Sequence, residues 1–400
     1  MAFDYGAEVA EKVNTFKKWP KDGDMCCLLD GDMLPYIVGY STDELRAMRA
    51  IKMAQFLYGK EPDPDDWAWI ECLLKQPYFE DKIDHLNFEL NRWVTESKAD
   101  SAKIYLTSSA DNFRIDIAFS RKYKGERKKG KPPFFKEFRT YLLVKHEAIL
   151  AIGEEADDLM CIEQEYQNRL LEAQGVEIGS HTHKDFANTI ISTKDKDLRI
   201  RAGLHHCPTS REIFFVTTLG SLEPVWKDKQ SVKFEHWPTV KGVAVNPDIN
   251  KGPYDAFKRG AKKGVVKTKR VKVGYETTQY IDKLKGGGLK FFYSQLIVGD
   301  VVDNYSGIEG CGKEIAYELL NGCSSERELF ETTLALYRSK YSPDNSPIWR
   351  ENYRGGKALI TPYQLMLEQG RLAWMQTSVG ELWRDKHFCP SGVDEIWKKE

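Results

Sequence analysis

The sequence predicts an α/β fold built on a twisted, mainly parallel sheet flanked by helices. Short apolar runs that end in acidic or turn residues alternate with long amphipathic stretches, as expected for parallel strands joined by crossover helices. The chain has 400 residues, of which 41% are hydrophobic. This is enough to bury a full core plus an additional region, and it excludes a disordered or low-complexity protein.

The individual elements follow from their residue patterns. Short apolar runs predict strands at 25–29, 103–107 and 189–192. Longer stretches with apolar residues every three or four positions predict helices at 41–58, 80–97, 134–150 and 154–173. Further helices are expected at 290–298, 313–320 and 361–375. Between Leu198 and Gly288 the periodicity is lost, and the run Gly286, Gly287 and Gly288 could act as a hinge.

The overall charge is balanced, because 59 Lys and Arg face 60 Asp and Glu. A uniformly basic or acidic protein is therefore excluded. No stretch reaches the roughly 18 apolar residues of a membrane span, and the segment from Met1 to Lys12 lacks the apolar region of a signal peptide. We expect a soluble, cytoplasmic protein with no membrane partner. The eight cysteines show no zinc-ligand spacing, so reduced thiols are expected.

Basic residues gather in two runs. From Arg121 to Lys131, seven of eleven residues are Lys or Arg, and from Lys258 to Lys272 the count is eight of fifteen with no acid. Tyr123 and the nearby Phe134 and Phe135 favour nucleic acid as the partner of the first run, since aromatic rings stack on bases while cations meet phosphates. A solvated surface loop is the equal alternative for either run.

Carboxylates form four clusters along the chain. A turn or a helix cap explains any single cluster. If the clusters converged beyond the carboxyl ends of parallel strands, their repulsion would need divalent cations, and oxygen ligands favour Mg²⁺ or Mn²⁺. Two such ions predict phosphodiester hydrolysis. The residues are Asp30 and Asp32; Glu155, Asp157 and Asp158; Asp195 and Asp197; and Asp300 and Asp303.

A glycine-rich turn precedes the helix expected at 313–320. The run from Gly307 to Lys313 fits the opening of a nucleotide-binding P-loop literally, but Glu314 stands where Ser or Thr must bind Mg²⁺. We therefore reject ATP hydrolysis. A hairpin between two helices fits better, and it would grip duplex backbone without reading bases.

Five motifs together resemble the flap-endonuclease (5′ nuclease) family, and within it the bacteriophage 5′-3′ exonucleases. They occur in the family's order: LLDGD at 28–32, YKGER at 123–127, EADD at 155–158, DKDL at 195–198 and GDVVDNYSGIEGCGK at 299–313. The resemblance implies a PIN-like core at 1–200 with a helical arch at about 121–150. It also implies a helix-hairpin-helix region at 289–400, which leaves 201–288 as an insertion that carries the second basic run.

The resemblance also implies roles for particular residues. Two metal ions would be held by the carboxylates Asp30, Glu155, Asp157, Asp158, Asp195, Asp197, Asp300 and Asp303. Lys124 and Arg127 would act at the scissile phosphate, beside the DNA-binding residues Arg121 and Lys122. Gly307, Gly310, Gly312 and Lys313 would form the hairpin, which in this family often carries K⁺.

One position departs from the family pattern. Ser109 stands where a carboxylate is expected after the second strand, and Asp111 lies two residues later as a substitute ligand. The resemblance implies a metal-dependent 5′-3′ exonuclease with flap endonuclease activity on DNA 5′ ends or flaps, with RNA/DNA hybrids left open. If the chain is phage-encoded, it would act in the host cytoplasm. A non-catalytic, structure-specific DNA-binding protein is the alternative.

Overall fold

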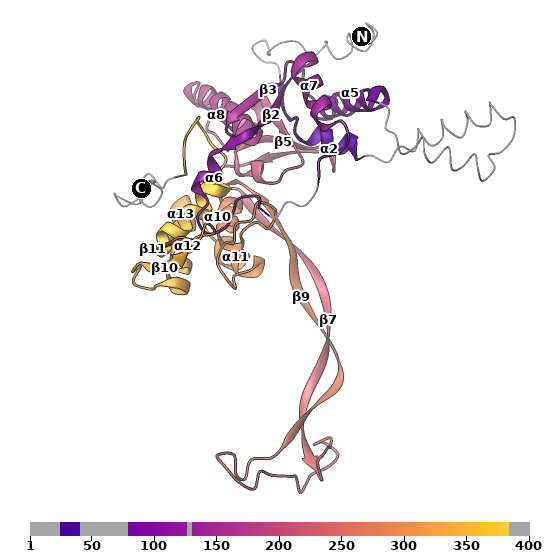
Figure 1. Cartoon of the computed structure of the whole chain (residues 1–400), viewed down its shortest axis with the longest axis vertical. Coiled ribbons are helices and arrows are strands. Elements are labelled where there is room, and N and C mark those ends of the chain that lie inside the picture. Colours follow the sequence, from indigo (N-terminus) through magenta and orange to yellow (C-terminus); the bar gives the residue numbers. More distant parts are fainter. Residues whose placement is uncertain (1–24, 41–78, 126–129, 384–400) are drawn as a thin grey trace, which may run out of the picture. The chain divides into compact units, whose positions relative to one another are not determined.

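A computed structural model describes residues 25–40, 79–125 and 130–383 of the chain (Figure 1). The helix expected at 41–58 lies outside these residues. The chain divides into two compact units, one formed by 1–222 with 286–400 and the other by Glu223–Lys285. We call the second the ribbon unit.

A six-stranded sheet organises the larger unit and confirms the α/β fold class. Its strand order is β3-β2-β1-β4-β5-β6. The first five strands are parallel, and β6 runs antiparallel to β5. Because the order reverses next to β1, the carboxyl ends of β1 and β4 flank a switch point, where ligands of open α/β sheets bind. The strands are β1 (Cys26–Asp30), β2 (Ser101–Asn112), β3 (Ile149–Gly153), β4 (Thr189–Ser192), β5 (Gly203–Cys207) and β6 (Glu212–Val216).

Helices cover both faces of this sheet. Cys27 and Leu29 of β1 pack in one cluster with buried residues of α2 (Met33–Gly39), α5 (Phe79–Glu96) and α7 (Phe135–Lys145). Leu28 points to the opposite face, because successive side chains of a strand alternate. Its partner in the register, Lys103, forms an ion pair with Glu163 of α8 (Ala156–Ala173) at 3.1 Å. All of β1 is buried, as expected for a central parallel strand.

The helix expected at 134–150 is shorter in the structure and is followed by a strand. Helix α7 ends at Lys145, Glu147 adopts a left-handed φ of 51°, and β3 begins at Ile149. Neither glycine nor proline marks this boundary, so the apolar spacing continues through it. Phe138 and Leu142 of α7 are buried in the core cluster. The helix in the segment expected to form the arch therefore packs on the sheet.

The C-terminal helices lie close to their expected bounds. They are α10 (Gly288–Val298), α11 (Lys313–Leu320) and α13 (Pro362–Ala373). The sequence patterns did not predict α12 (Glu326–Tyr341) or the hairpin of β10 (Ile348–Glu351) and β11 (Lys357–Ile360). Short elements complete the unit: α6 (Phe113–Ile117), α9 (His181–Phe186) and the 3₁₀ helix η1 (Asp197–Ile200). Within the described residues, no helix is both long and apolar enough to cross a bilayer.

The segment expected to be irregular is largely β-structure. β5 and β6, which fall within the expected insertion, belong to the six-stranded sheet. Two further strands of 20 residues each, β7 (Ser221–Val240) and β9 (Thr268–Gly287), form a ribbon with the short β8 (Val243–Ala244) (Figure 1). Most residues of this ribbon are exposed, and they lie on both of its faces. The sequence therefore lacks the continuous apolar alternation that would predict these strands.

The three glycines that could act as a hinge lie at a close backbone contact. A Cβ on Gly220 would stand 1.7 Å from the carbonyl oxygen of Gly287, and one on Gly288 would meet the Cα of Gly220 at 2.6 Å. Gly220 and Gly288 also have positive φ angles of 74° and 66°. The glycines therefore allow two chain segments to touch here.

Candidate functional site

Carboxylates from four separate segments meet beyond the carboxyl ends of β1 and β4. The hydroxyl of Tyr123 and the ammonium group of Lys196 each contact carboxylates from two segments that are distant in sequence. The Tyr123 hydroxyl lies 3.2 Å from both Glu155 and Asp303. Lys196 Nζ lies 3.1 Å from Asp197 and 2.6 Å from Asp300. We call the following residues the acidic cluster: Asp30, Glu155, Asp157, Asp195, Asp197, Asp300 and Asp303.

The centre of the acidic cluster holds excess negative charge. Burial raises the pKa of Asp30 to about 7, and the charges of Asp32 and Asp195 act in the same direction. Burial, with the charges of Asp30 and Asp195, raises the pKa of Asp157 well above its usual value. Burial also raises the pKa of Asp195. Asp30, Asp157 and Asp195 also line one and the same cleft.

Cations neutralise the charge of Glu155 within the cluster. It precedes α8 as its N-cap, where the helix dipole favours negative charge. Lys124 Nζ and the Asn112 amide both contact its Oε1, and Arg114 lies 3.4 Å from its Oε2. Burial alone would raise the pKa of Glu155, but Arg114 and Lys124 hold it below its usual range.

The second cation of the site is Lys196, for which the sequence motifs predict no role. Burial opposes its charge, yet the ion pairs with Asp197 and Asp300 raise the pKa of Lys196. Asp197 also accepts from the Gln295 side chain, while burial and the neighbouring Asp195 raise the pKa of Asp197 to about 7. The signal for Lys196 is its place between two aspartates of the DKDL motif.

Asp158 forms a buried ion pair with Arg114. Arg114 donates to its two oxygens at 2.6 and 2.8 Å, and both side chains are fully buried. The backbone N–H of Gln376 donates to the same carboxylate at 3.1 Å. These contacts fix the position of the Asp158 carboxylate, and its role as a metal ligand stays a prediction.

A cleft of about 830 Å³ opens on the acidic cluster. Asp30, Glu155, Asp157 and Asp195 line one part of it, together with Lys124. Its other lining residues include the cations Lys131, Lys136 and Arg139 and the aromatic rings of Tyr36 and Phe135. Arg139 also pairs with Asp32 and so links α7 to the turn after β1. A cleft with cations and rings beside a carboxylate centre suits a polyanion that carries bases.

The structure describes only some of the remaining expected site residues. Arg127 lies outside the described residues, as does the side chain of Asp111 in β2. Arg121 and Lys122 are exposed. The backbone of Lys122 accepts from the Asn304 amide at 2.9 Å, and the backbone N–H of Lys124 donates to the Asp303 carbonyl at 2.9 Å. The basic segment is therefore anchored to the loop that follows α10.

The glycine turn joins α10 and α11 as a hairpin. Gly307 has a φ of 59°, and a Cβ there would meet the backbone nitrogen of Gly299 at 2.4 Å. Its N–H donates to the buried Gln369 of α13 at 3.0 Å, so this amide holds the hairpin against α13. Gly310 has a φ of 76°, Gly312 is the N-cap of α11, and Lys313 is its first residue.

Among the described residues, no group of three or more His, Cys, Asp and Glu side chains forms a ready-made metal site. Lys124 and Lys196 instead engage the outer carboxylates directly. The residues nevertheless fit hard divalent cations, because the donors are all oxygens and the central carboxylates are buried with raised pKa values. Mg²⁺ keeps several of its waters, and so it needs few direct carboxylate ligands.

We expect the Asp30→Asn variant to be more heat-stable than the wild type at pH 8 without divalent metal. The pKa of Asp30 rises from 3.8 to about 7 on folding, so the folded protein binds more protons between these pH values. Wild-type stability therefore falls as the pH rises from 3.8 to about 7, and the variant lacks this loss. Thermal unfolding with and without Mg²⁺ measures both effects, since Mg²⁺ should stabilise the wild type more. Equal midpoints and equal Mg²⁺ shifts would contradict the expectation; Asp84→Asn, an exposed α5 residue, is the control.

No protein-family model and no curated protein matches the chain. Solved structures from bacteriophage T5 are similar to it. One is a T5 protein co-crystallised with metal ions, and another is a T5 flap endonuclease variant in a pseudo-enzyme-product complex with DNA and metal ions. Each is 13% identical, with a TM-score of 0.32, over 80% of this chain and 91% of the other. A T5 5′-exonuclease mutant is 12% identical, with a TM-score of 0.30, over the same shares of the two chains. At these identities and TM-scores, the T5 structures assign neither a family nor a function to the chain.

Proposed function

We propose that the chain is a metal-dependent nuclease that hydrolyses phosphodiester bonds at the acidic cluster. The observation that carries the proposal is the convergence of buried carboxylates from four segments at the switch point of the sheet, with Lys124 and Lys196 beside them. Negative charge in excess of the local cations is costly to bury unless a bound ion or substrate group balances it. A stable protein has no structural need for such a cluster.

Mg²⁺ or Mn²⁺ would be held by the acidic cluster, with two ions as the proposed number. When bound, such ions supply Lewis acidity and lower the pKa of water. Within the chain, Asp30, Asp157 and Asp195 provide the central charge that attracts the ions. Lys124, at the edge of the cleft, would help neutralise the phosphate during cleavage, and Arg127 is proposed beside it. Asp111 stays a proposed additional ligand.

The proposed substrate is DNA with a 5′ end or flap, with RNA/DNA hybrids as a further substrate to be tested. The cleft beside the acidic cluster combines cations and aromatic rings, which suits a single strand that approaches the carboxylates. The hairpin residues Gly310, Gly312 and Lys313 are proposed to contact duplex backbone, with K⁺ as a proposed ion there. Arg121 and Lys122 are proposed as further backbone contacts.

A 5′-labelled flap substrate tests the proposal. The full chain is expected to release labelled product with Mg²⁺ or Mn²⁺ and to release none in excess chelator. Binding to the same substrate in chelator is measured in parallel by anisotropy. Release that persists in chelator would overturn the metal dependence, and binding without release in Mg²⁺ would favour the non-catalytic DNA-binding alternative.

Replacing Lys124 with methionine should lower single-turnover cleavage by about 10²-fold, the typical cost of losing one preorganised electrostatic group. Methionine keeps the apolar stem but removes the ammonium that contacts Glu155. The control is Lys98→Met, which removes the same charge from an exposed side chain outside the cleft. Equal losses in the two variants would show that Lys124 acts only through general charge.

A further inference from the structure

The ribbon unit carries an uneven share of the chain's charge. Between Glu223 and Lys285 there are 15 Lys and Arg against 7 Asp and Glu, a net charge of +8, whereas the whole chain has a net charge of −1. Such a concentration of one sign on 63 residues favours an anionic partner.

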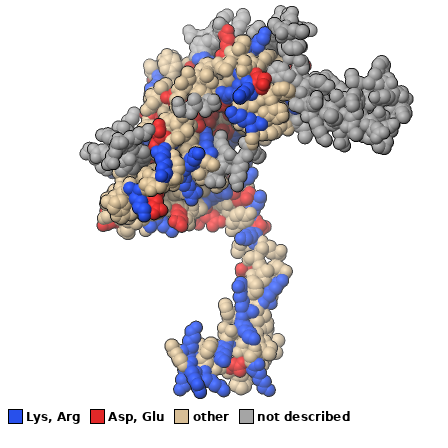
Figure 2. Space-filling view, in the orientation of Figure 1, with Lys and Arg blue, Asp and Glu red and all other residues tan. Residues whose placement is uncertain are grey.

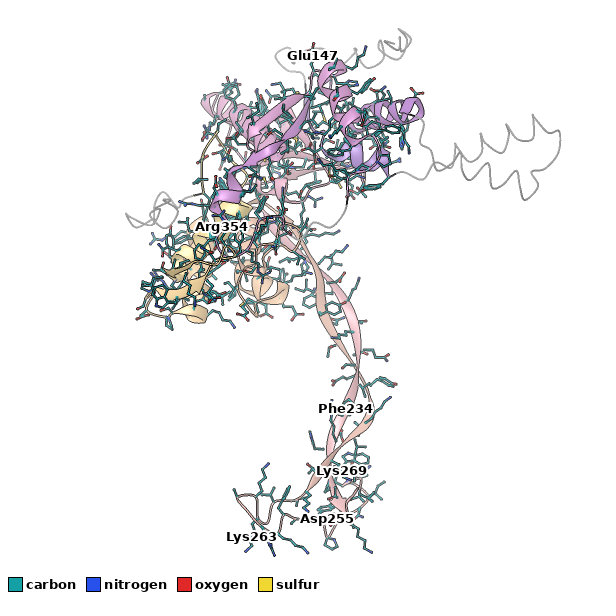
Figure 3. The ribbon with its side chains drawn as sticks, viewed as in Figure 1. Glu147, Phe234, Asp255, Lys263, Lys269 and Arg354 are labelled. Atoms are coloured by element: carbon teal, nitrogen blue, oxygen red, sulfur yellow. The ribbon has the colours of Figure 1, made fainter. Side chains whose placement is uncertain are left out.

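The positive charge is concentrated at one end of the ribbon unit. Every residue from Phe257 to Arg270 is exposed, and no acid occurs between Ala256 and Tyr275. Figure 2 shows Lys and Arg side chains crowded at this end, and Figure 3 places Lys263 and Lys269 there. The nearest acid, Asp255, accepts backbone N–H bonds from residues 241 and 242 at 3.1 and 2.7 Å. The carboxylate of Asp255 is thus hydrogen-bonded within the ribbon unit itself.

Three cations of this unit lie over aromatic rings. The Arg270 guanidinium stands 3.7 Å from the centroid of Phe234, and the ammonium of Lys272 stands 4.3 Å from that of Tyr275. Lys267 lies 5.3 Å from the ring of Phe257. These contacts place a cation beside each of the three rings, so the surface presents positive charge there, which favours phosphate contact.

The shape of the unit also suits a duplex. A strand rises about 3.3 Å per residue, so two paired 20-residue strands reach roughly 65 Å. A ribbon of two strands with both faces in water is marginally stable by itself, and it is narrow enough for the major groove of DNA, which is about 12 Å wide. We propose that the ribbon unit is an arm that binds the phosphate backbone of double-stranded DNA without reading its sequence. This role is independent of catalysis at the acidic cluster.

Duplex binding by the full chain, in chelator and over a series of salt concentrations, tests the arm. The tip variant replaces four exposed cations by glutamine: Lys258, Arg259, Lys262 and Lys263. We expect it to bind duplexes of unrelated sequence at least about tenfold more weakly than the wild type. The slope of log K against log salt should shrink by about 1 for each phosphate that no longer meets a cation. The control variant changes three Lys and one Arg, all exposed, in the larger unit: Lys98, Lys145, Arg169 and Lys184.

Any of the following outcomes would contradict the proposal that the ribbon unit binds duplex DNA. The tip variant could keep wild-type affinity and slope, or the control variant could lose as much as the tip variant. The tip variant could also lose affinity only for phosphatidylserine vesicles or only for single-stranded DNA. Either result would assign the tip to a different partner. Circular dichroism of both variants checks that the strands remain. Because no metal and no cleavage enter the assay, failure of the arm leaves the proposed nuclease activity untouched, and the reverse also holds.

Discussion

The Asp195→Asn/Asp197→Asn double variant is expected to cleave a 5′-flap substrate at least about 10³-fold more slowly than the wild type in Mg²⁺. Both residues follow β4 and lie where the carboxylates converge. Asparagine keeps an oxygen that can accept the existing bonds, from the backbone N–H of residue 197 to Asp195 at 2.9 Å and from Lys196 to Asp197 at 3.1 Å. The substitutions therefore remove charge with little change of shape. Single-turnover rates measure the effect.

A matched double variant separates this effect from a general loss of acidity. Asp84 on α5 and Asp185 on α9 are exposed and lie outside the cleft, so Asp84→Asn/Asp185→Asn should cleave at the wild-type rate. The site variant should also keep or exceed wild-type heat stability without metal, because burial raises the pKa of both Asp195 and Asp197. Wild-type cleavage by the site variant would remove the acidic cluster from the proposed reaction.

Replacing Arg114 with methionine is expected to destabilise the larger unit by about 3–5 kcal/mol, the usual cost of leaving one buried charge unpaired. Arg114 is fully buried and holds Asp158 through two bonds. It also donates to the backbone carbonyls of Leu372 at 3.0 Å and Trp374 at 2.7 Å. These bonds join α6, α8 and the end of α13. Urea unfolding followed by tryptophan fluorescence measures the change.

The double variant Arg114→Met/Asp158→Leu distinguishes an unpaired charge from reduced packing. If the cost comes mainly from the stranded Asp158 carboxylate, the double variant should be more stable than Arg114→Met alone. Added destabilisation in the double variant would contradict this explanation. It would then place the cost in the bonds from Arg114 to the chain after α13.

Local signals were enough for the elements with a clear apolar pattern. The strand at 189–192 and the helix at 313–320 match the structure in their bounds. β3 was missed because an edge strand with exposed Leu150 and Ile152 carries no burial alternation that separates it from the preceding helix. β7 and β9 were missed for a related reason, since a ribbon exposed on both faces has no apolar side to repeat.

In the candidate site, too, the sequence predicts features that depend on neighbouring residues, but not features that depend on residues distant in the chain. Aspartates at strand ends could be found because the carboxyl edge of a parallel sheet gathers them. The direction of Asp158 could not be found, because it depends on Arg114, 44 residues earlier in the chain. Spacing alone puts Glu155 and Asp158 on the same face of α8. Only the packing of α6 and of the chain after α13 separates their roles.

The contact between Gly220 and Gly287 means that the chain leaves and re-enters the larger unit at almost the same point. Thr218 and Leu219 accept backbone N–H bonds from Leu289 and Lys290 at 3.0 and 2.9 Å, next to this contact. The core of the larger unit therefore does not constrain the number of residues between Gly220 and Gly287. Residues could be added or removed in facing pairs along the two strands, which would lengthen or shorten the ribbon while the backbone contact between Gly220 and Gly287 stays in place.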